Sequence, residues 1–369
     1  MQRIHVGILF NNKTYLGIPN NATGVESIDN YEEAAVIYGL IPCYLRLQDL
    51  NLTTGQCTAY LKQKHKYVRT AMPIPSIIHN RAIYTDAKAN QTIEKLLKQG
   101  FIIFNTFNRY GKDEIYKLLN QNTALQPFLP HTEDATTSNI TDMMTRYNDL
   151  ILKPCNGSIG RGIMRLQYVK PSWELTYTRP GSDRKSITQL LTKGKLPLFL
   201  RNRILLSPYI IQERIQLATY KECPYDLRVT IQRGLNSQWQ ITGMFAKVAL
   251  SNTFVTNIAR GGGVFPIEYI LSKSLENLQP ELIIDQVGQL ALRIAHQLER
   301  HIPFAADLGM DIGLTSSGHP YFIECNGRDQ RYGFRKANLM ESWKSSYRQP
   351  MGYARFLFNQ EYLLPYEAT

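Results

Sequence analysis

Residues 310–327 read MDIGLTSSGHPYFIECNG, and this stretch decides the fold of the C-terminal two-thirds of the chain. Its Ser-Gly pair at 317–318 lies between two alternating apolar runs, which is typical of a β-hairpin turn. With the turn centred on that pair, Asp311 and Glu324 lie equally far from it and face each other across the hairpin. Asn326 lies two residues beyond Glu324 and shares its face of the strand. The three side chains therefore form one all-oxygen cluster.

This oxygen cluster predicts a magnesium site. Carboxylate and amide oxygens suit Mg²⁺ when phosphates and water complete its shell. Two opposed carboxylates also repel each other unless a cation offsets their charge. The alternative is that both carboxylates simply face solvent. Cys325 points to the opposite face of the strand, so we interpret it as a core residue and not as a nucleophile.

A second pattern, ILKPCNGSIGRG at 151–162, predicts a phosphate-binding loop. A strand carries Lys153, and Gly157, Gly160 and Gly162 follow it in a turn. Glycines let backbone N–H groups approach phosphate oxygens, and the lysine adds a point charge. The spacing fits neither a Walker A loop nor a dinucleotide fingerprint. An ordinary glycine-rich hairpin is the alternative.

Polar residues also interrupt the apolar strands between these two patterns. Asp226 and Arg228 lie on one face of their strand, and Lys247 lies within the apolar run MFAKVAL. Asn257 precedes a triple glycine at 261–263. Cations in half-buried positions need anions, which a nucleotide phosphate would supply. The alternative is a set of internal ion pairs, such as Asp226 with Arg228 or with Lys247.

Length and periodicity predict two or three subdomains in this chain of 369 residues. In residues 1–125 strands alternate with helices, which indicates a parallel α/β sheet. The connector QPFLP at 126–130 marks the boundary to the second part, where the strands read as antiparallel. Ile283 to Arg300 has the clearest helical periodicity.

Composition narrows the classes of function. The net charge of +12 favours an anionic partner, but no basic block or recognition motif predicts specific binding to nucleic acid. The five cysteines are odd in number and form no CxxC pair, so we expect no disulfide framework and a reducing compartment. No apolar run approaches the ~18 residues that a membrane helix needs. We therefore expect a cytoplasmic protein with no membrane insertion.

Taken in order, these motifs resemble the ATP-grasp superfamily, and within it the spore-coat-associated YheC/YheD-type proteins. The resemblance covers roughly residues 112–335, with a looser match at PSIIHNR, residues 75–81. The segments that carry it are KPCNGSIGRG at 153–162, YIIQE at 209–213, PYDLRV at 224–229, TNIARGGG at 256–263, DIG at 311–313 and FIECN at 322–326.

The resemblance implies a fold of the α/β (α+β) class. An N-terminal parallel-sheet α/β domain would span residues 1–125. An ATP-grasp domain of two α+β subdomains clasping the nucleotide would span 126–345. Residues 346–369 would form a C-terminal tail that packs on the domain.

The resemblance also implies roles for single residues. Arg228 and Lys247 would stabilise charge on the transferring phosphoryl group, although the family usually has arginine at position 247. The metal ligands, for two Mg²⁺ ions, would be Asp311, Glu324 and Asn326. ATP would be bound by Lys153, Gly157, Ser158, Gly160, Gly162, Gln212, Glu213, Ile215, Asp226 and Asn257. Lys112 and Lys117 both remain candidates for the family's first nucleotide-binding lysine.

The implied activity is an ATP-dependent ligase that activates a carboxylate as an acylphosphate for attack by an amine or a thiol. The alternative is a non-catalytic structural or interaction protein of the spore coat, with coat proteins as partners. Residues 327–331, GRDQR, differ from the small-residue-then-proline turn of many such ligases, in a region that often contacts the acceptor. The sequence therefore leaves the substrates open.

Overall fold

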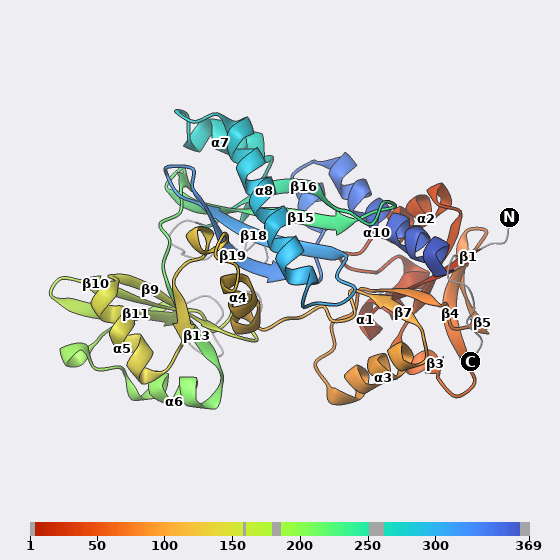
Figure 1. The fold of residues 1–369 in the computed structure, drawn as a ribbon, viewed down its shortest axis with the longest axis horizontal. Coiled ribbons are helices and arrows are strands. Elements are labelled where there is room, and N and C mark those ends of the chain that lie inside the picture. Colours follow the sequence, from red (N-terminus) through yellow and green to blue (C-terminus); the bar gives the residue numbers. More distant parts are fainter. Residues whose placement is uncertain (1–3, 158–159, 179–185, 251–261, 362–369) are drawn as a thin grey trace.

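The computed structural model describes residues 4–157, 160–178, 186–250 and 262–361. Three β-sheets follow one another along the long axis of the molecule (Figure 1). Ser158 and Asn257, two of the predicted ATP-binding residues, lie outside the described residues.

The N-terminal sheet has the predicted parallel core. Its central strands run in the order β2-β1-β6-β7, and every neighbouring pair in that run is parallel. Helices α2 and α3 begin at side-chain caps, Ser27 and Asp86, that accept from backbone N–H groups. The elements are β1 (Ile4–Leu9), α1 (Asn12–Gly17), α2 (Ile28–Ile37), β2 (Leu40–Leu45), β6 (Ile77–Asn80), α3 (Ala87–Lys98) and β7 (Ile102–Phe104).

An antiparallel extension of this sheet has no counterpart in the sequence analysis. Strand β4 (Gln56–Gln63) pairs with β2, with β3 (Leu50–Asn51) and with β5 (Lys66–Pro73). Most of β5 is exposed or half-buried. Only Tyr67, Thr70 and Met72 are half-buried, and their uneven spacing does not give the two-residue period from which a strand is predicted.

The second sheet is smaller and lies at the left of Figure 1. Its order is β12-β11-β10-β9-β13-β8, and α5 and α6 pack their buried residues into its core. Thr136 caps α5 by accepting from the backbone N–H of Asn139. The elements are β8 (Thr132–Asp134), α5 (Thr137–Arg146), β9 (Asp149–Pro154), β10 (Met164–Val169), β11 (Ser172–Thr178), β12 (Ser186–Leu190), α6 (Leu198–Leu206) and β13 (Tyr209–Glu213).

The central sheet, in the order β17-β16-β15-β18-β19, buries one face against α8. Leu227, Val229 and Ile231 of β15 belong to that core, so the residues between them project from the other face. The elements are α4 (Lys112–Asn120), β14 (Thr219–Tyr220), β15 (Cys223–Arg233), β16 (Trp239–Val248), β17 (Gly263–Phe265), α7 (Ile267–Ser274), α8 (Pro280–Glu299), β18 (Asp307–Leu314) and β19 (Pro320–Asn326).

The last described helix returns to the N-terminal sheet. After α9 (Tyr332–Lys336), helix α10 (Met340–Glu361) packs Tyr347, Met351 and Ala354 into the same core as Ile8 of β1. Helix α10 runs without a break through the proposed domain boundary at residues 345 and 346. The division into domains therefore stays a prediction. No helix in the described part of the chain is both long and apolar enough to cross a membrane.

Candidate functional site

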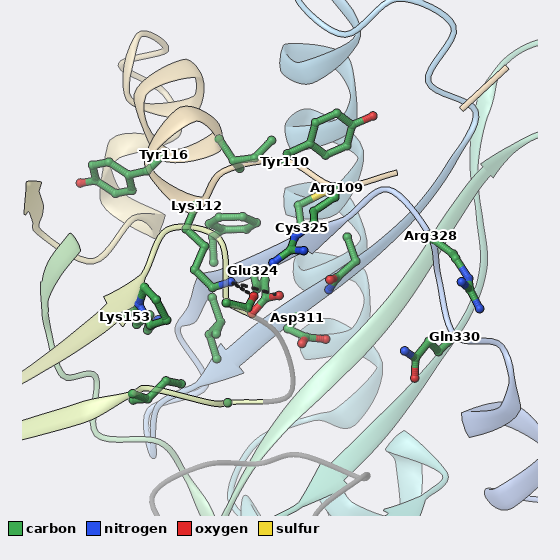
Figure 2. Close-up of a pocket in the computed structure, with 18 of the residues that line it drawn as sticks. Arg109, Tyr110, Lys112, Tyr116, Lys153, Asp311, Glu324, Cys325, Arg328 and Gln330 are labelled. Carbon is green, nitrogen blue, oxygen red and sulfur yellow. Dashed lines mark hydrogen bonds and ion pairs between the residues drawn. The ribbon is translucent and has the colours of Figure 1, made fainter. Parts of the chain in front are cut away.

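A cavity of about 300 Å³ lies where the small sheet, the central sheet and α4 meet (Figure 2). The small sheet contributes Lys153 and Gln212, while the central sheet contributes Arg228 and Asp311. The predicted site residues that line this cavity are Lys153, Gly157, Gly160, Gln212, Arg228, Lys247, Asp311, Glu324 and Asn326.

The hairpin of β18 and β19 pairs Asp311 directly with Glu324, as the sequence predicted. Two departures from the expected geometry cancel. Near the turn Ile312 pairs with Phe322, which centres the hairpin on Ser317 and not after it. A bulge then adds Ile323 and restores the expected pair. The bulge also explains why Phe322 is buried in the core, whereas Glu324, two residues further along the strand, is not.

Two cations clamp the Asp311 carboxylate. The Nε of Arg228 donates to Oδ1 at 2.7 Å, and the Nζ of Lys247 lies 2.8 Å from Oδ2. Lys247 also pairs with Asp226 at 2.9 Å. Burial favours the neutral acid, but the charges of Arg228 and Lys247 outweigh it and hold the pKa of Asp311 below its usual range. The cations therefore form internal ion pairs, one of the two alternatives that the sequence left open.

Between the two candidate lysines, the structure brings only Lys112 to the cavity. Its Nζ donates to the carbonyl oxygen of Gly157 at 3.1 Å and lies 3.6 Å from Oε1 of Glu324. Lys117 instead pairs with Asp134 on the surface, at 3.4 Å. Lys112 therefore links the glycine-rich segment to the carboxylates, whereas Lys117 does not reach the cavity.

Lys153 is a partly desolvated ammonium. Its Nζ donates to Oε1 of Gln212 at 2.6 Å, and the amide nitrogen of Gln212 donates to Thr132 at 2.7 Å. Burial, together with the charge of Lys112, outweighs the attraction of Glu324 and lowers the pKa of Lys153 to about 8. A further anion beside Lys153 would stabilise its charged form.

Four predicted residues do not line the cavity. The carboxylate of Glu213 accepts from the backbone N–H of His131 at 2.9 Å, and Ile215 follows the end of β13. Asp226 lies behind Lys247. Gly162 has a φ of +75°, and an added Cβ would lie 3.0 Å from the hydroxyl of Tyr209. Glycine at 162 is therefore required by the turn itself.

Several other residues that line the cavity were not predicted from the sequence. One group belongs to the segment before α4, and another follows β19. Only the unusual GRDQR sequence pointed to the second group. The unassigned lining residues include Asn108, Arg109, Tyr110, Tyr116, Arg161, Arg328, Gln330 and Tyr332.

The chemistry of the hairpin face fits a hard divalent cation. Asp311, Glu324 and Asn326 offer carboxylate and amide oxygens, the ligands that such a cation prefers, and all three line the cavity. The described residues contain no cluster of three histidine, cysteine, aspartate or glutamate side chains suited to a metal. The third protein ligand would therefore be the amide of Asn326.

Comparison with known proteins supports the resemblance to ATP-grasp proteins that the sequence motifs indicated. The model of the YheC/D-like ATP-grasp family matches residues 100–357. Endospore coat-associated protein YheD of Bacillus subtilis (strain 168) is 24% identical over 314 residues, which are 84% of this chain and 68% of YheD.

Two solved ligases have a similar fold. The ATP-grasp ligase PsnB, complexed with minimal precursor, gives a TM-score of 0.52 at 14% identity, over 91% of this chain and 95% of PsnB. The VanG D-Ala:D-Ser ligase of Enterococcus faecalis gives 0.52 at 11% identity, over 96% of this chain and 100% of that one. At such identities the likeness extends to the fold alone. With a family match over more than half of its length, the chain belongs to the YheC/D-like ATP-grasp family.

Proposed function

We propose that this protein is an ATP- and magnesium-dependent ligase that joins a carboxylate to an amine or a thiol. One observation carries the proposal. Lys112 and Lys153 come from α4 and from the small sheet, and both approach the cavity that Asp311 and Glu324 also line. Cations from two elements facing carboxylates across one cavity suit a nucleoside triphosphate with its metal.

The nucleotide would lie between the two sheets. Lys112, Lys153 and the backbone at Gly157 and Gly160 would contact the phosphates. The adenine would lie along the end of β13, beside Gln212, Glu213 and Ile215. Ser158 and Asn257 remain proposed phosphate contacts, and Asp226 would act by fixing Lys247.

Asp311, Glu324 and Asn326 would hold two Mg²⁺ ions, which would supply charge neutralisation between the phosphates. Arg228 and Lys247 already contact Asp311, at 2.7 and 2.8 Å, so their charges lie next to the proposed phosphoryl-transfer position. There they would stabilise negative charge that develops during transfer.

The reaction would proceed in two displacements. A carboxylate oxygen of the substrate attacks the γ-phosphorus of ATP, which releases ADP and forms an acylphosphate. The amine nitrogen or thiol sulfur then attacks the acyl carbon and loses its proton, and inorganic phosphate departs. The protein contributes chiefly by positioning and by charge stabilisation.

A second function, a non-catalytic protein of the spore coat, is favoured by a different observation. The charges of Arg228 and Lys247 are already matched by internal partners, namely Asp311, Asp329 and Asp226. These internal ion pairs neutralise the two cations, so the site does not require a bound nucleotide to be stable. The relative YheD is named as endospore coat-associated, and the same association is proposed for this chain.

Isothermal titration with AMP-PNP, a non-hydrolysable ATP analogue, tests the proposal. We expect binding that requires magnesium, followed by carboxylate-dependent ADP release when ATP and hydroxylamine, a trapping nucleophile, are supplied. Magnesium-dependent binding without ADP release for any carboxylate would favour the non-catalytic function. No binding at millimolar AMP-PNP would refute the nucleotide site itself.

A further inference from the structure

Arg328 lines the cavity with a guanidinium that has almost no partner. Arg328 follows β19 in the chain, and its side chain is 19% exposed. The nearest carboxylate, Glu26, lies 3.8 Å from Nε, and Nε is buried without a hydrogen bond. Among the described residues no hydrogen bond from this side chain is present, although a guanidinium carries five N–H donors. Such a group is prepared to receive an anion.

One oxygen of Glu26 is engaged by a different guanidinium, and its other oxygen, Oε2, is buried and accepts no hydrogen bond among the described residues. The engaged oxygen, Oε1, accepts from Nη2 of Arg81 at 2.8 Å. Arg81 also donates to Asp307 at 3.0 Å and to the carbonyl oxygen of Asp329 at 2.7 Å, while Arg331 pairs with Asp307. Arg81 and Arg331 therefore each donate through both terminal nitrogens, although their Nε atoms, like that of Arg328, are buried without a hydrogen bond in the described part of the chain. Among the three guanidiniums, Arg328 is the one that lines the cavity and donates no hydrogen bond to the described residues.

The position of Arg328 separates it from the proposed phosphate contacts. In Figure 2, Arg328 and Gln330 lie on one side of Asp311, and Lys112 and Lys153 lie on the other. If the phosphates contact the two lysines, the reacting carboxylate lies near Asp311. The Arg328 end then holds a part of the acceptor that does not react.

The charge of the cavity also calls for anions beyond the nucleotide. Among the described residues, seven cationic side chains line it against two carboxylates, Asp311 and Glu324. Asp226 and Asp329, which pair with Lys247 and Arg228 behind the lining, bring the carboxylates to four and leave three positive charges over, because the charge of Glu26 is matched by Arg81. ATP⁴⁻ with two Mg²⁺ ions is neutral, so it does not match this surplus. The cations are Arg109, Lys112, Lys153, Arg161, Arg228, Lys247 and Arg328.

We infer that Arg328 binds a carboxylate of the acceptor that is not phosphorylated, so that the acceptor is a molecule with at least two carboxylates. This inference rests on the proposed function and names its substrate class. Gln330, exposed in the same lining, offers an amide donor to the same group. Free dicarboxylic acids and acidic peptides share this chemistry.

The test compares matched acids on the protein saturated with AMP-PNP and magnesium. Butyrate and glutarate have chains of similar length and differ by one carboxylate. We expect glutarate to bind about 10- to 100-fold more tightly, the usual effect of a charge-assisted hydrogen-bonded pair. Equal affinities, or no binding of either acid, would overturn the inference while AMP-PNP binding leaves the nucleotide site standing.

Variants assign the effect to Arg328. We expect Arg328→Gln to lose the preference for glutarate while its affinity for AMP-PNP stays unchanged. Arg328→Lys keeps the positive charge but not the planar guanidinium that donates two parallel hydrogen bonds, so it should retain part of the preference. Arg348→Gln, which removes an arginine that pairs with Glu341 and does not line the cavity, is the control and should keep the preference. If Arg328→Gln keeps it as well, Arg328 is only a structural partner of Glu26.

Tetraglutamate identifies the source of the carboxylates. Tighter binding than glutarate supports an acidic peptide as the acceptor, and equal binding supports a free dicarboxylic acid. If AMP-PNP itself does not bind, the proposed function fails, and this inference with it.

Discussion

The guanidinium of Arg228 is fixed by the buried carboxylate of Asp329, with Nη1 donating to Oδ1 at 2.8 Å. The other oxygen of Asp329 accepts from the hydroxyl of Thr230. Because Nε of Arg228 donates to Asp311, the guanidinium is held between two carboxylates from different segments. Asp329 touches no reacting atom in the proposed mechanism. It positions the residue that does.

We expect Asp329→Ala to lower the free energy of unfolding by about 3–5 kcal/mol, because it leaves Arg228 buried with half of its ion pairs. Asp329→Asn should cost less, since the amide oxygen still accepts a hydrogen bond. Urea denaturation measures both. Glu341→Ala, which removes an exposed partner of Arg348, is a control and should change stability by less than about 1 kcal/mol. Similar losses in Asp329→Ala and the control would contradict the positioning role.

Glu324→Gln should abolish the magnesium dependence of AMP-PNP binding while leaving the fold intact. Its side chain is 30% exposed, and its ion pair with Lys112 spans 3.6 Å, so the loss of stability should stay below about 1 kcal/mol. Titration calorimetry with and without magnesium measures the first effect, and thermal denaturation checks the second. Unchanged magnesium-dependent binding would remove Glu324 from the proposed ligands.

Lys153→Ala should weaken ATP far more than adenosine, because the proposed contact of Lys153 is with phosphate. A charge-assisted contact of this kind contributes about 1.5–3 kcal/mol, or roughly 10- to 150-fold in affinity. Lys117→Ala, at an exposed lysine paired with Asp134, is the matched control and should weaken neither ligand. If Lys153→Ala weakens both ligands equally, Lys153 does not contact phosphate.

The affinity for ATP should fall as pH rises above 8. In the free protein, burial lowers the pKa of Lys153 to about 8, whereas bound phosphates favour the charged lysine and raise that pKa. Below pH 8 Lys153 is charged in both states, and affinity does not depend on its titration. Above pH 8 binding must take up a proton, so affinity falls by up to about tenfold per pH unit.

Titrations between pH 7.5 and about 9.5, above the range in which the ATP γ-phosphate titrates, measure this slope. Lys153→Arg keeps its charge throughout, so its profile should be flat over the same range. A wild-type profile as flat as that of Lys153→Arg would show that Lys153 does not take up the proton.

The sequence predicted those parts of the molecule that depend on local pattern. Alternation and strand–helix order predicted the parallel core of the first sheet and the facing pair Asp311 and Glu324. That pair came out right although the bulge at Ile323 was not foreseen, because the misplaced turn offset it. Strand β5 is largely exposed and has no regular apolar pattern, so no strand was predicted at its position.

The rest of the site depends on contacts between distant segments. Arg81 at the end of β6 meets Asp307 at the start of β18 and the backbone of Asp329 beyond β19. The spacing of residues along the sequence does not indicate contacts between segments this far apart. The choice between Lys112 and Lys117, and the lack of partners for Arg328, likewise became visible only when the segments were placed together.

Helix α10 has a consequence for the way this protein is made. Tyr347, Met351 and Ala354 fill the core around β1, and the hydroxyl of Tyr347 accepts from the backbone N–H of Ser27 at 3.0 Å. Because β1 is synthesised before α10, the core around β1 cannot close until α10 has also been made. Until then β1 and its neighbours expose apolar surface, so a shortened chain that ends before α10 should aggregate during synthesis.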